Sequence, residues 1–410
     1  MPISYQVGTI DDYLSRICEQ IQLTETQFLT AVKRYRIVGE WLTETETHLD
    51  RLGPEIFPQG SMLQRTTIRP MRLGQDVVPF DIDTVCRCTI DPYVRTSQSL
   101  YGSVQSRLIA NADFAERNRE AQDKLGTSGK CIRLAYTSDD FYLDVVPTCK
   151  DPSDSEGVRL LMCEPKRWHD YKKPIETWRR TDPFRFAAWL QARCEIRGVL
   201  SEKRIAASVA PVPPQEDVDV KAPLRLITQL LKRQRDIDFI ADTCRPTSIL
   251  LTTLAGRHYR GEESIAEGLE TVLNGILSQI AMAGSRRIVV LNPADEIAPH
   301  DGGVEDLAAP LDDAAYGKFC AMIGKMQRML AEAKAARGVP SLYPILAESF
   351  GDKVVKRAFN ASEDSVKMAS KTGVLGAAGA TGLHILPEPK AVSGIQPVPS
   401  HNFHGSADGV

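Results

Sequence analysis

The stretch Phe57–Cys88, FPQGSMLQRTTIRPMRLGQDVVPFDIDTVCRC, combines a Gly-Ser turn with a strand that carries two aspartates. Side chains on a strand alternate between its faces, so Asp81 and Asp83 project together, away from Ile82. Two carboxylates held a few ångströms apart repel each other, and Mg²⁺ is the usual partner of such a pair beside a phosphate-binding turn. The stretch therefore predicts a metal site on one face of the strand.

The turn at Gly60-Ser61 predicts a phosphate site next to these aspartates. Glycine lets the backbone approach an anion closely. The N–H groups and the hydroxyl at the start of Met62–Arg65 can donate hydrogen bonds to phosphate oxygens. The turn and the strand together indicate a combined phosphate and metal site more specifically than either does alone.

A Gly-Ser turn followed by a strand with Asp-x-Asp resembles the signature of the polymerase-beta-like nucleotidyltransferases. The fuller wording, QGSMLQRTTIRP and then FDIDTVC, is similar to the bacterial CD-NTases, relatives of animal cyclic GMP-AMP synthase. The resemblance implies an α+β fold: a polymerase-beta-like core with a spine helix, then a C-terminal helical domain of the oligoadenylate synthetase type. It also implies that Gln59, Gly60 and Ser61 contact phosphate.

A predicted hairpin, residues 131–136 and 140–146, carries a third candidate carboxylate. Asp144 shares a strand face with Tyr142 and Val146, and burying an unpaired carboxylate is costly, so it needs a partner. We interpret Asp144 as the third ligand of a two-metal site. A structural aspartate with its own partner is the alternative. The resemblance also implies a catalytic aspartate here.

The pattern of elements predicts two domains and a tail: residues 1–180 form the nucleotidyltransferase core, 181–371 the helical domain and 372–410 a flexible tail. A capping box at Thr24 begins the predicted spine helix, which extends to Leu49. One helix is predicted over residues 100–120, and the last long helix over 311–337. The tail is rich in Gly, Ala, Pro and Ser, so we expect it to be disordered.

In the helical domain, QLLKRQRD followed by PTSILLTTLA is similar to the helix pair that holds the donor triphosphate in CD-NTases. The resemblance implies that Lys232 and Ser248 bind this triphosphate. Arg233 and Arg235 are rivals for the role of Lys232.

Two segments are less clear. Residues 295–313 contain seven acidic residues and no lysine or arginine. The sequence departs here from the pattern that is common in CD-NTases. We therefore expect a solvated loop. Residues 164–180 interleave aromatic and basic side chains, which is typical either of nucleic-acid binding or of a structural segment folded onto the core. We favour the structural interpretation.

Composition excludes several classes of function. The net charge of −3 does not predict general nucleic-acid binding. No apolar run reaches the roughly 20 residues of a membrane span, and no signal peptide is recognisable, so we expect a cytoplasmic protein. We expect its nine cysteines to be reduced.

The resemblance implies a cyclic oligonucleotide synthase. Asp81, Asp83 and Asp144 would hold two Mg²⁺ or Mn²⁺ ions, and NTPs, with ATP among them, would be joined into a cyclic di- or trinucleotide that activates an antiphage effector. One rival is a linear nucleotidyltransferase acting on RNA or protein, and a second is a catalytically silent nucleotide-binding scaffold.

The tail ends in FHGSADGV, a small-residue terminus with one aromatic side chain. The resemblance implies that a HORMA-type partner or a ubiquitin-activating-like enzyme could capture such an end. An inert end is the alternative.

Overall fold

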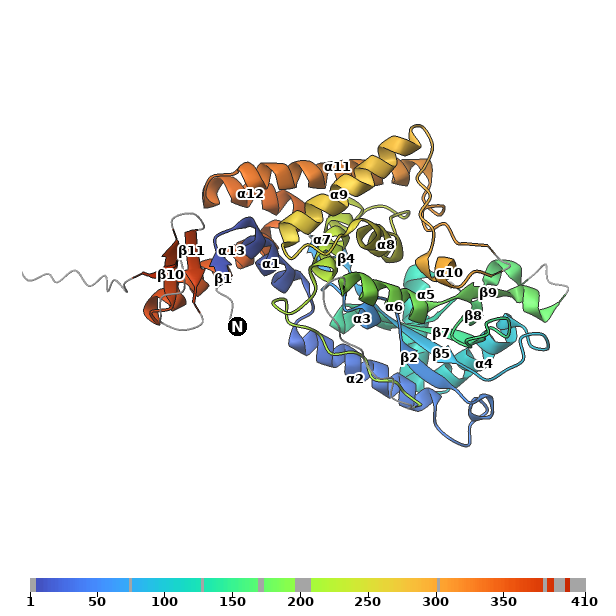
Figure 1. Ribbon diagram of the computed structural model, residues 1–410. Coiled ribbons are helices and arrows are strands. Elements are labelled where there is room, and N and C mark those ends of the chain that lie inside the picture. The colour runs from blue at the N-terminus through green and yellow to red at the C-terminus, as the bar shows by residue number, and fades with distance from the viewer. Residues whose placement is uncertain are drawn as a thin grey trace, which may run out of the picture.

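The computed structural model describes most of the chain: residues 5–73, 76–126, 129–168, 173–195, 208–300, 303–378, 382–386 and 395–398. Two hydrophobic cores divide these residues into a sheet unit, built around the central β-sheet, and a helical unit. Figure 1 shows the helical unit above the sheet unit, with α2 running along the lower edge.

The sheet unit contains a six-stranded sheet in the order β2-β5-β7-β8-β9, with β6 also paired to β7. Strands β5 and β7 are parallel, and the other pairs are antiparallel. The predicted hairpin is present, because β6 and β7 pair in antiparallel register across a short turn. The strand bounds are β2 Glu55–Pro58, β5 Phe80–Arg87, β6 Ile132–Tyr136, β7 Phe141–Lys150, β8 Leu160–Cys163 and β9 Trp178–Thr181. A separate pair joins β3 Met71–Leu73 to β4 Asp76–Val78.

Helix α2, Glu25–Leu42, is the predicted spine helix and begins with the predicted capping box at Thr24. It ends before Thr43, whose backbone N–H and hydroxyl both bond to the carbonyl of Gly39, so the helix does not extend to Leu49. The helix predicted over residues 100–120 is also two helices, α4 Ser97–Ile109 and α5 Ala112–Leu125. Asn111 caps the second through its side chain and so separates them.

The helical unit packs most of the remaining helices around a second core that includes the N-terminal helix α1. Its principal helices are α1 Ile10–Ile21, α6 Pro183–Cys194, α7 Pro223–Asp238, α8 Ser248–His258, α9 Ile265–Ala283, α11 Asp313–Ala335, α12 Val339–Phe350 and α13 Asp352–Lys371. Helix α13 is 20 residues long, so α11 is not the last long helix. The domain boundaries at 180 and 371 remain predictions.

The two ends of the chain share a small sheet in the order β1-β11-β10-β12, which lies at one end of the molecule beside α13 and α1 (Figure 1). Its strands are β1 Tyr5–Val7, β10 Leu375–Ala378, β11 Gly382–Ile385 and β12 Gln396–Pro397. The prediction of a disordered tail is therefore wrong for these residues. Their partner strand comes from the opposite end of the chain, so tail composition could not indicate it. Residues 399–410, on which the partner predictions depend, lie outside the described residues.

None of the helices in the described ranges is long and apolar enough to cross a membrane.

Candidate active site

The candidate site is built on β5. Phe80, Ile82 and Thr84 are buried on one face of this strand, whereas Asp81 and Asp83 are partly exposed on the other. The alternation predicted from the sequence is therefore confirmed, and both carboxylates face a cavity.

The Gly-Ser turn lies directly against Asp83. Gly60 has a left-handed backbone, with φ of 59°, and a Cβ atom placed on it would lie 2.1 Å from the Oδ2 of Asp83. The backbone N–H of Gln59 donates to the carbonyl of Asp83 at 2.9 Å. The Oγ of Ser61 lies 3.0 Å from the hydroxyl of Thr67. Only glycine combines this backbone conformation with so close an approach to the carboxylate.

Asp144 lies on the strand next to β5, and the parallel register sets it opposite Asp83. It is buried, with 5% of its surface exposed. As predicted, this carboxylate has a partner: Arg133 on β6 donates from Nε and Nη2 to its two oxygens, at 2.6 and 2.5 Å. The Sγ of Cys131 lies 3.3 Å from Oδ2. Arg133 was not predicted from the sequence, although its position in the hairpin opposite Asp144 could have indicated it.

The carboxylates of β5 are difficult to ionise together. Burial, followed by the charges of Asp81 and Asp144, raises the pKa of Asp83 to about 7. The side chain of Asp81 is 45% exposed, yet the surrounding protein and the charge of Asp144 raise its pKa to about 6, against the opposite effect of Arg133. Negative charge at this site is therefore incompletely neutralised by the protein's own cations.

Lys232 on α7 reaches the same cavity from the helical unit. It is 2% exposed, and its Nζ lies 2.8 Å from the Oγ1 of Thr66. Burial, and then the charge of Arg235, lowers the pKa of Lys232 to about 7. A buried amine with so few charged neighbours of opposite sign would gain an ion-pair partner from a bound triphosphate.

The two rivals of Lys232 differ in position. Arg235 lines the cavity and donates to the Oγ of Ser248 at 3.0 Å, while it also pairs with Asp236 at 2.6 Å. Arg233 is turned to the backbone carbonyl of Arg69 at 3.1 Å and does not line the cavity. The position of Arg233 therefore rules it out as a phosphate ligand in this cavity. Arg235 holds the Ser248 hydroxyl through its hydrogen bond.

The cavity has a volume of about 490 Å³ and lies between the two units. Every residue predicted for the site except Asp144 lines it: Gln59, Gly60, Ser61, Asp81, Asp83, Lys232 and Ser248. Arg245, in the loop before α8, also lines it and was not predicted. Within the described residues its guanidinium makes no hydrogen bond or ion pair.

The three aspartates suit a divalent metal ion. Asp81, Asp83 and Asp144 supply only carboxylate oxygens, the hard donors that Mg²⁺ and Mn²⁺ prefer, and their excess negative charge favours a cation. Across the part of the chain that the structure describes, no three acidic, histidine or cysteine side chains are already positioned to share one ion.

Comparison with known proteins supports this interpretation. No known family profile matches the chain. It is 26% identical over 404 residues to the c-di-GMP synthase of Roseivirga ehrenbergii, an alignment that covers 97% of both chains. It is 24% identical over 375 residues to the cyclic dinucleotide synthase CdnG of Bradyrhizobium diazoefficiens, which covers 86% of this chain and 83% of the relative. The chain is similar to the bacterial CD-NTases over most of its length. It is thus an enzyme, a nucleotidyltransferase of the type that synthesises cyclic oligonucleotides.

Solved structures of CD-NTases confirm the fold. The GTP complex of the CD-NTase CdnG from Bradyrhizobium diazoefficiens is 22% identical and covers 87% of this chain and 99% of that chain, with a TM-score of 0.63. The CdnC:HORMA-deltaN complex from E. coli is 12% identical and covers 83% and 96%, with a TM-score of 0.54. The predicted α+β fold, a polymerase-beta-like core with a helical domain, is confirmed.

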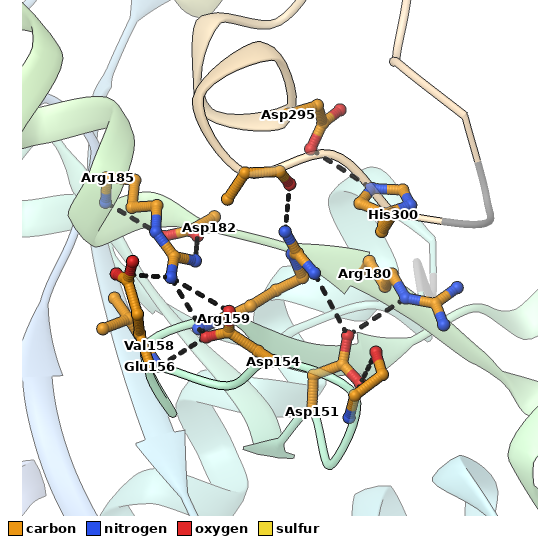
Figure 2. A network of polar contacts seen from close by, with 12 residues as sticks. Asp151, Asp154, Glu156, Val158, Arg159, Arg180, Asp182, Arg185, Asp295 and His300 are labelled. Carbon is orange, nitrogen blue, oxygen red and sulfur yellow. Dashed lines mark hydrogen bonds and ion pairs between the residues drawn. The ribbon is translucent and has the colours of Figure 1, made fainter.

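A polar network joins the two units (Figure 2), and one of its members, Asp182, lines the cavity. Arg185 on α6 pairs with Asp182 at 2.5 Å and with Asp154 at 2.9 Å. Arg159 contacts Asp151 at 3.8 Å and donates to the carbonyl of Ala298. The network thus ties the loop between β7 and β8 to α6 and to the end of α10, Pro293–Ile297.

The acidic segment 295–313 takes part in this network, so the prediction of a solvated loop is wrong for its first part. Asp295 is buried, contacts His300 at 3.3 Å and accepts the backbone N–H of Glu305 at 3.0 Å. Glu305 also pairs with Arg179 on β9. Glu305 thus has a cationic partner on the sheet unit, which local composition does not indicate.

The aromatic and basic segment 164–180 is structural in its described part. Trp178 is buried and donates to the carbonyl of Arg95 at 3.1 Å. Trp168 donates to the Oγ of Ser97 at 3.0 Å. Both indole rings therefore hold the segment on the sheet unit instead of presenting their faces to bases. Residues 169–172, which belong to the same sequence pattern, lie outside the described residues.

Proposed function

We propose that this protein joins two nucleoside triphosphates into a cyclic dinucleotide in the cavity between its units. One observation carries the proposal: the cavity brings the acidic strand β5 and the Gly-Ser turn from the sheet unit together with Lys232 and Ser248 from the helical unit. Acidic residues that can hold metal thus face basic and hydroxyl groups that can hold phosphate, which is the combination that nucleotidyl transfer requires.

The residues have separate roles. Asp81, Asp83 and Asp144 would hold two Mg²⁺ ions, which Mn²⁺ could replace. Bound metal would lower the pKa of the attacking ribose hydroxyl and neutralise charge on the pyrophosphate leaving group. Lys232 and Ser248 bind the triphosphate of the donor, with Arg235 orienting the Ser248 hydroxyl. The backbone at Gly60 and the Ser61 hydroxyl contact the phosphates from the other side.

Each round forms a bond between a ribose oxygen of the acceptor and the α-phosphorus of the donor, and breaks the bond from that phosphorus to pyrophosphate. The hydroxyl proton is lost to solvent or to a nearby carboxylate. In the second round donor and acceptor belong to the same linear intermediate, so the ring closes. Two rounds give a dinucleotide, in agreement with the names of both relatives.

We propose GTP as a substrate. The Roseivirga relative is named for a product with two guanines, and the Bradyrhizobium structure was solved with GTP. The sequence analysis proposed ATP among the substrates, and the DncV structure from Vibrio cholerae holds the linear intermediate pppA(3',5')pG. Single and mixed NTPs therefore distinguish a diguanylate product from a mixed one.

We further propose that the product is a second messenger of antiphage signalling, made in the cytoplasm, where NTPs are abundant. This rests on the resemblance to the CD-NTases. A HORMA-type regulator is supported by the structural likeness to CdnC in its HORMA complex.

The test is incubation of purified protein with each NTP alone and in pairs, with Mg²⁺, followed by phosphatase treatment and mass spectrometry. We expect GTP alone to yield a phosphatase-resistant cyclic diguanylate, and Asp83→Asn to yield none. Extension of an added RNA or labelling of a protein, without a cyclic product, would favour the linear nucleotidyltransferase. No NTP consumption under any of these conditions would overturn the proposal.

A further inference from the structure

Arg133 belongs to a row of charged residues that the sheet register fixes. Asp83 on β5 lies opposite Asp144 on β7, and Asp144 lies opposite Arg133 on β6. Residues opposite one another on neighbouring strands project from the same face of a sheet. Two carboxylates and a guanidinium therefore lie side by side on the face that carries the candidate metal site. This order follows from backbone pairing.

The guanidinium engages Asp144 completely. Its Nε and Nη2 donate to Oδ1 and Oδ2 at 2.6 and 2.5 Å, so both oxygens of the carboxylate are occupied in a bidentate pair. The same Nη2 lies 3.5 Å from the Oδ1 of Asp81. The arginine thus supplies positive charge to two of the three carboxylates that a metal would need.

The same guanidinium is also placed so that it can move. The Arg133 side chain is 31% exposed, whereas that of Asp144 is 7% exposed. It lies over the ring of Tyr142, 5.0 Å from the ring centre, so this aromatic face remains available to the cation if it leaves the carboxylate. The carboxylate is therefore fixed, and the arginine is the partner with room to turn away.

We propose that Arg133 is a displaceable counter-ion of the metal site. It neutralises Asp81 and Asp144 while no metal is bound, and it releases Asp144 when a divalent cation binds. The inference rests on the metal site of the proposed function. Arginine and metal compete for the same oxygens, so the protein alone binds the cation weakly. A nucleotide strengthens binding, because its phosphates add ligands and offer the released guanidinium a new partner.

Arg133→Gln tests this competition. Free Mn²⁺ is measured by electron paramagnetic resonance during titration of the full chain without nucleotide, and again with GTP. In the variant, Mn²⁺ no longer has to displace a charge-assisted bidentate pair from Asp144. We therefore expect Mn²⁺ to bind about tenfold more tightly without nucleotide. The additional tightening by GTP should be smaller in the variant than in the natural protein.

Two comparisons separate competition from a general effect. Arg117→Gln removes an arginine that contacts the carbonyl of Ala135 on the same strand but none of the three aspartates, so its Mn²⁺ binding should match that of the natural protein. In an Asp144→Asn background, adding Arg133→Gln should change Mn²⁺ binding far less, because the contested ligand is already gone.

Thermal unfolding gives a second readout. Asp144 loses its partner in Arg133→Gln, so the variant should melt at a lower temperature without metal, and Mn²⁺ should raise its melting temperature more than that of the natural protein. Unchanged or weaker Mn²⁺ binding by Arg133→Gln would overturn the inference and leave Arg133 as a support for Asp144. In that case the natural protein could still make a cyclic product, which would uphold the proposed function. Failure of the inference is therefore distinguishable from failure of the proposed function.

Discussion

The Nζ of Lys232 lies 2.8 Å from the Oγ1 of Thr66, so a helix of the helical unit contacts the segment that follows the Gly-Ser turn. A second bond, 3.2 Å long, joins the same nitrogen to the backbone carbonyl of Thr66. Both partners are neutral oxygens, and burial lowers the pKa of the amine to about 7. The contact therefore positions a cation that can take up its full charge only when an anion arrives.

Lys232→Ala should raise the KM for GTP with a smaller effect on kcat, because a triphosphate clamp binds ground and transition states alike. With a pKa of about 7 in the free enzyme, the charged amine is lost as the pH rises above neutrality, so KM should rise between about pH 7 and 9. The variant should lose this pH dependence. Lys334→Ala, a surface lysine paired with Glu270, is the control. A fall in kcat alone would assign Lys232 to the leaving group instead.

Asp81→Asn and Asp83→Asn should each abolish product while the protein stays folded. Each substitution removes one member of a repelling pair, so the melting temperature without metal should be unchanged or higher. Asp139→Asn, in the turn before β7 and outside the cavity, should remain active. Turnover and thermal unfolding are measured on the same preparations. Undiminished turnover in both site variants would contradict the metal assignment.

The pKa values predict the pH dependence of stability. Asp81 and Asp83 titrate at about 6 and 7 in the folded protein, whereas an unfolded chain releases these protons near pH 4. Their contribution to the free energy of unfolding is thus full below about pH 4 and is lost as the pH rises through 6 and 7. Denaturant titrations of Asp83→Asn should show a flatter profile across this range. A profile unchanged by the substitution would mean that Asp83 is already ionised across this range.

Gly60→Ala should abolish activity, because the new Cβ atom would lie 2.1 Å from the Asp83 carboxylate and the backbone is left-handed. The backbone strain alone should cost about 1 kcal/mol of stability. Gly102→Ala is a matched control: this glycine lies in helix α4 with no neighbouring atom within 4 Å of the added group, so the change should be neutral or stabilise by about 0.5–1 kcal/mol. Full activity of Gly60→Ala would show that the turn need not approach the substrate.

Arg245→Ala should weaken binding of triphosphate and of pyrophosphate. Among the cavity cations in the described ranges, Lys232 and Arg235 donate hydrogen bonds within the protein, whereas Arg245 is held by no hydrogen bond and only its charge acts on Asp81. We expect a rise of about tenfold in the inhibition constant of pyrophosphate, as for loss of one charge-assisted contact. Arg286→Ala, an exposed arginine in the loop after α9, should leave this constant unchanged.

The sequence predicted the parts of the site that depend on local pattern. Alternation on β5 placed Asp81 and Asp83 correctly, and the apolar strand around Asp144 indicated that this carboxylate needs a partner. Lys232 and Ser248 came from the resemblance alone, since nothing in a basic helix end distinguishes a phosphate ligand from an ordinary terminal cation.

The sequence did not predict features that depend on partners distant in the chain. Arg245 lines the cavity because the loop between α7 and α8 lies beside the sheet unit, and the acidic segment is held by Arg159, which donates to the carbonyl of Ala298. The predictions of the helix ends were wrong for a local reason. The hydroxyl of Thr43 and the side chain of Asn111 interrupt the helices, although the apolar spacing of the sequence continues beyond them.

The small sheet that joins the chain ends sets an order of events during synthesis. Strand β1 precedes every helix of the described residues, whereas its partner β11 follows α13, so β1 is synthesised long before it can pair. The residues that line the cavity all lie at or before Asn292, so they are synthesised before β11. We expect hydrogen exchange on stalled nascent chains to show a protected β5 beside an unprotected β1, which becomes protected only after release. Removal of residues 372–410 would remove the partner strand, so β1 would stay unpaired and unprotected.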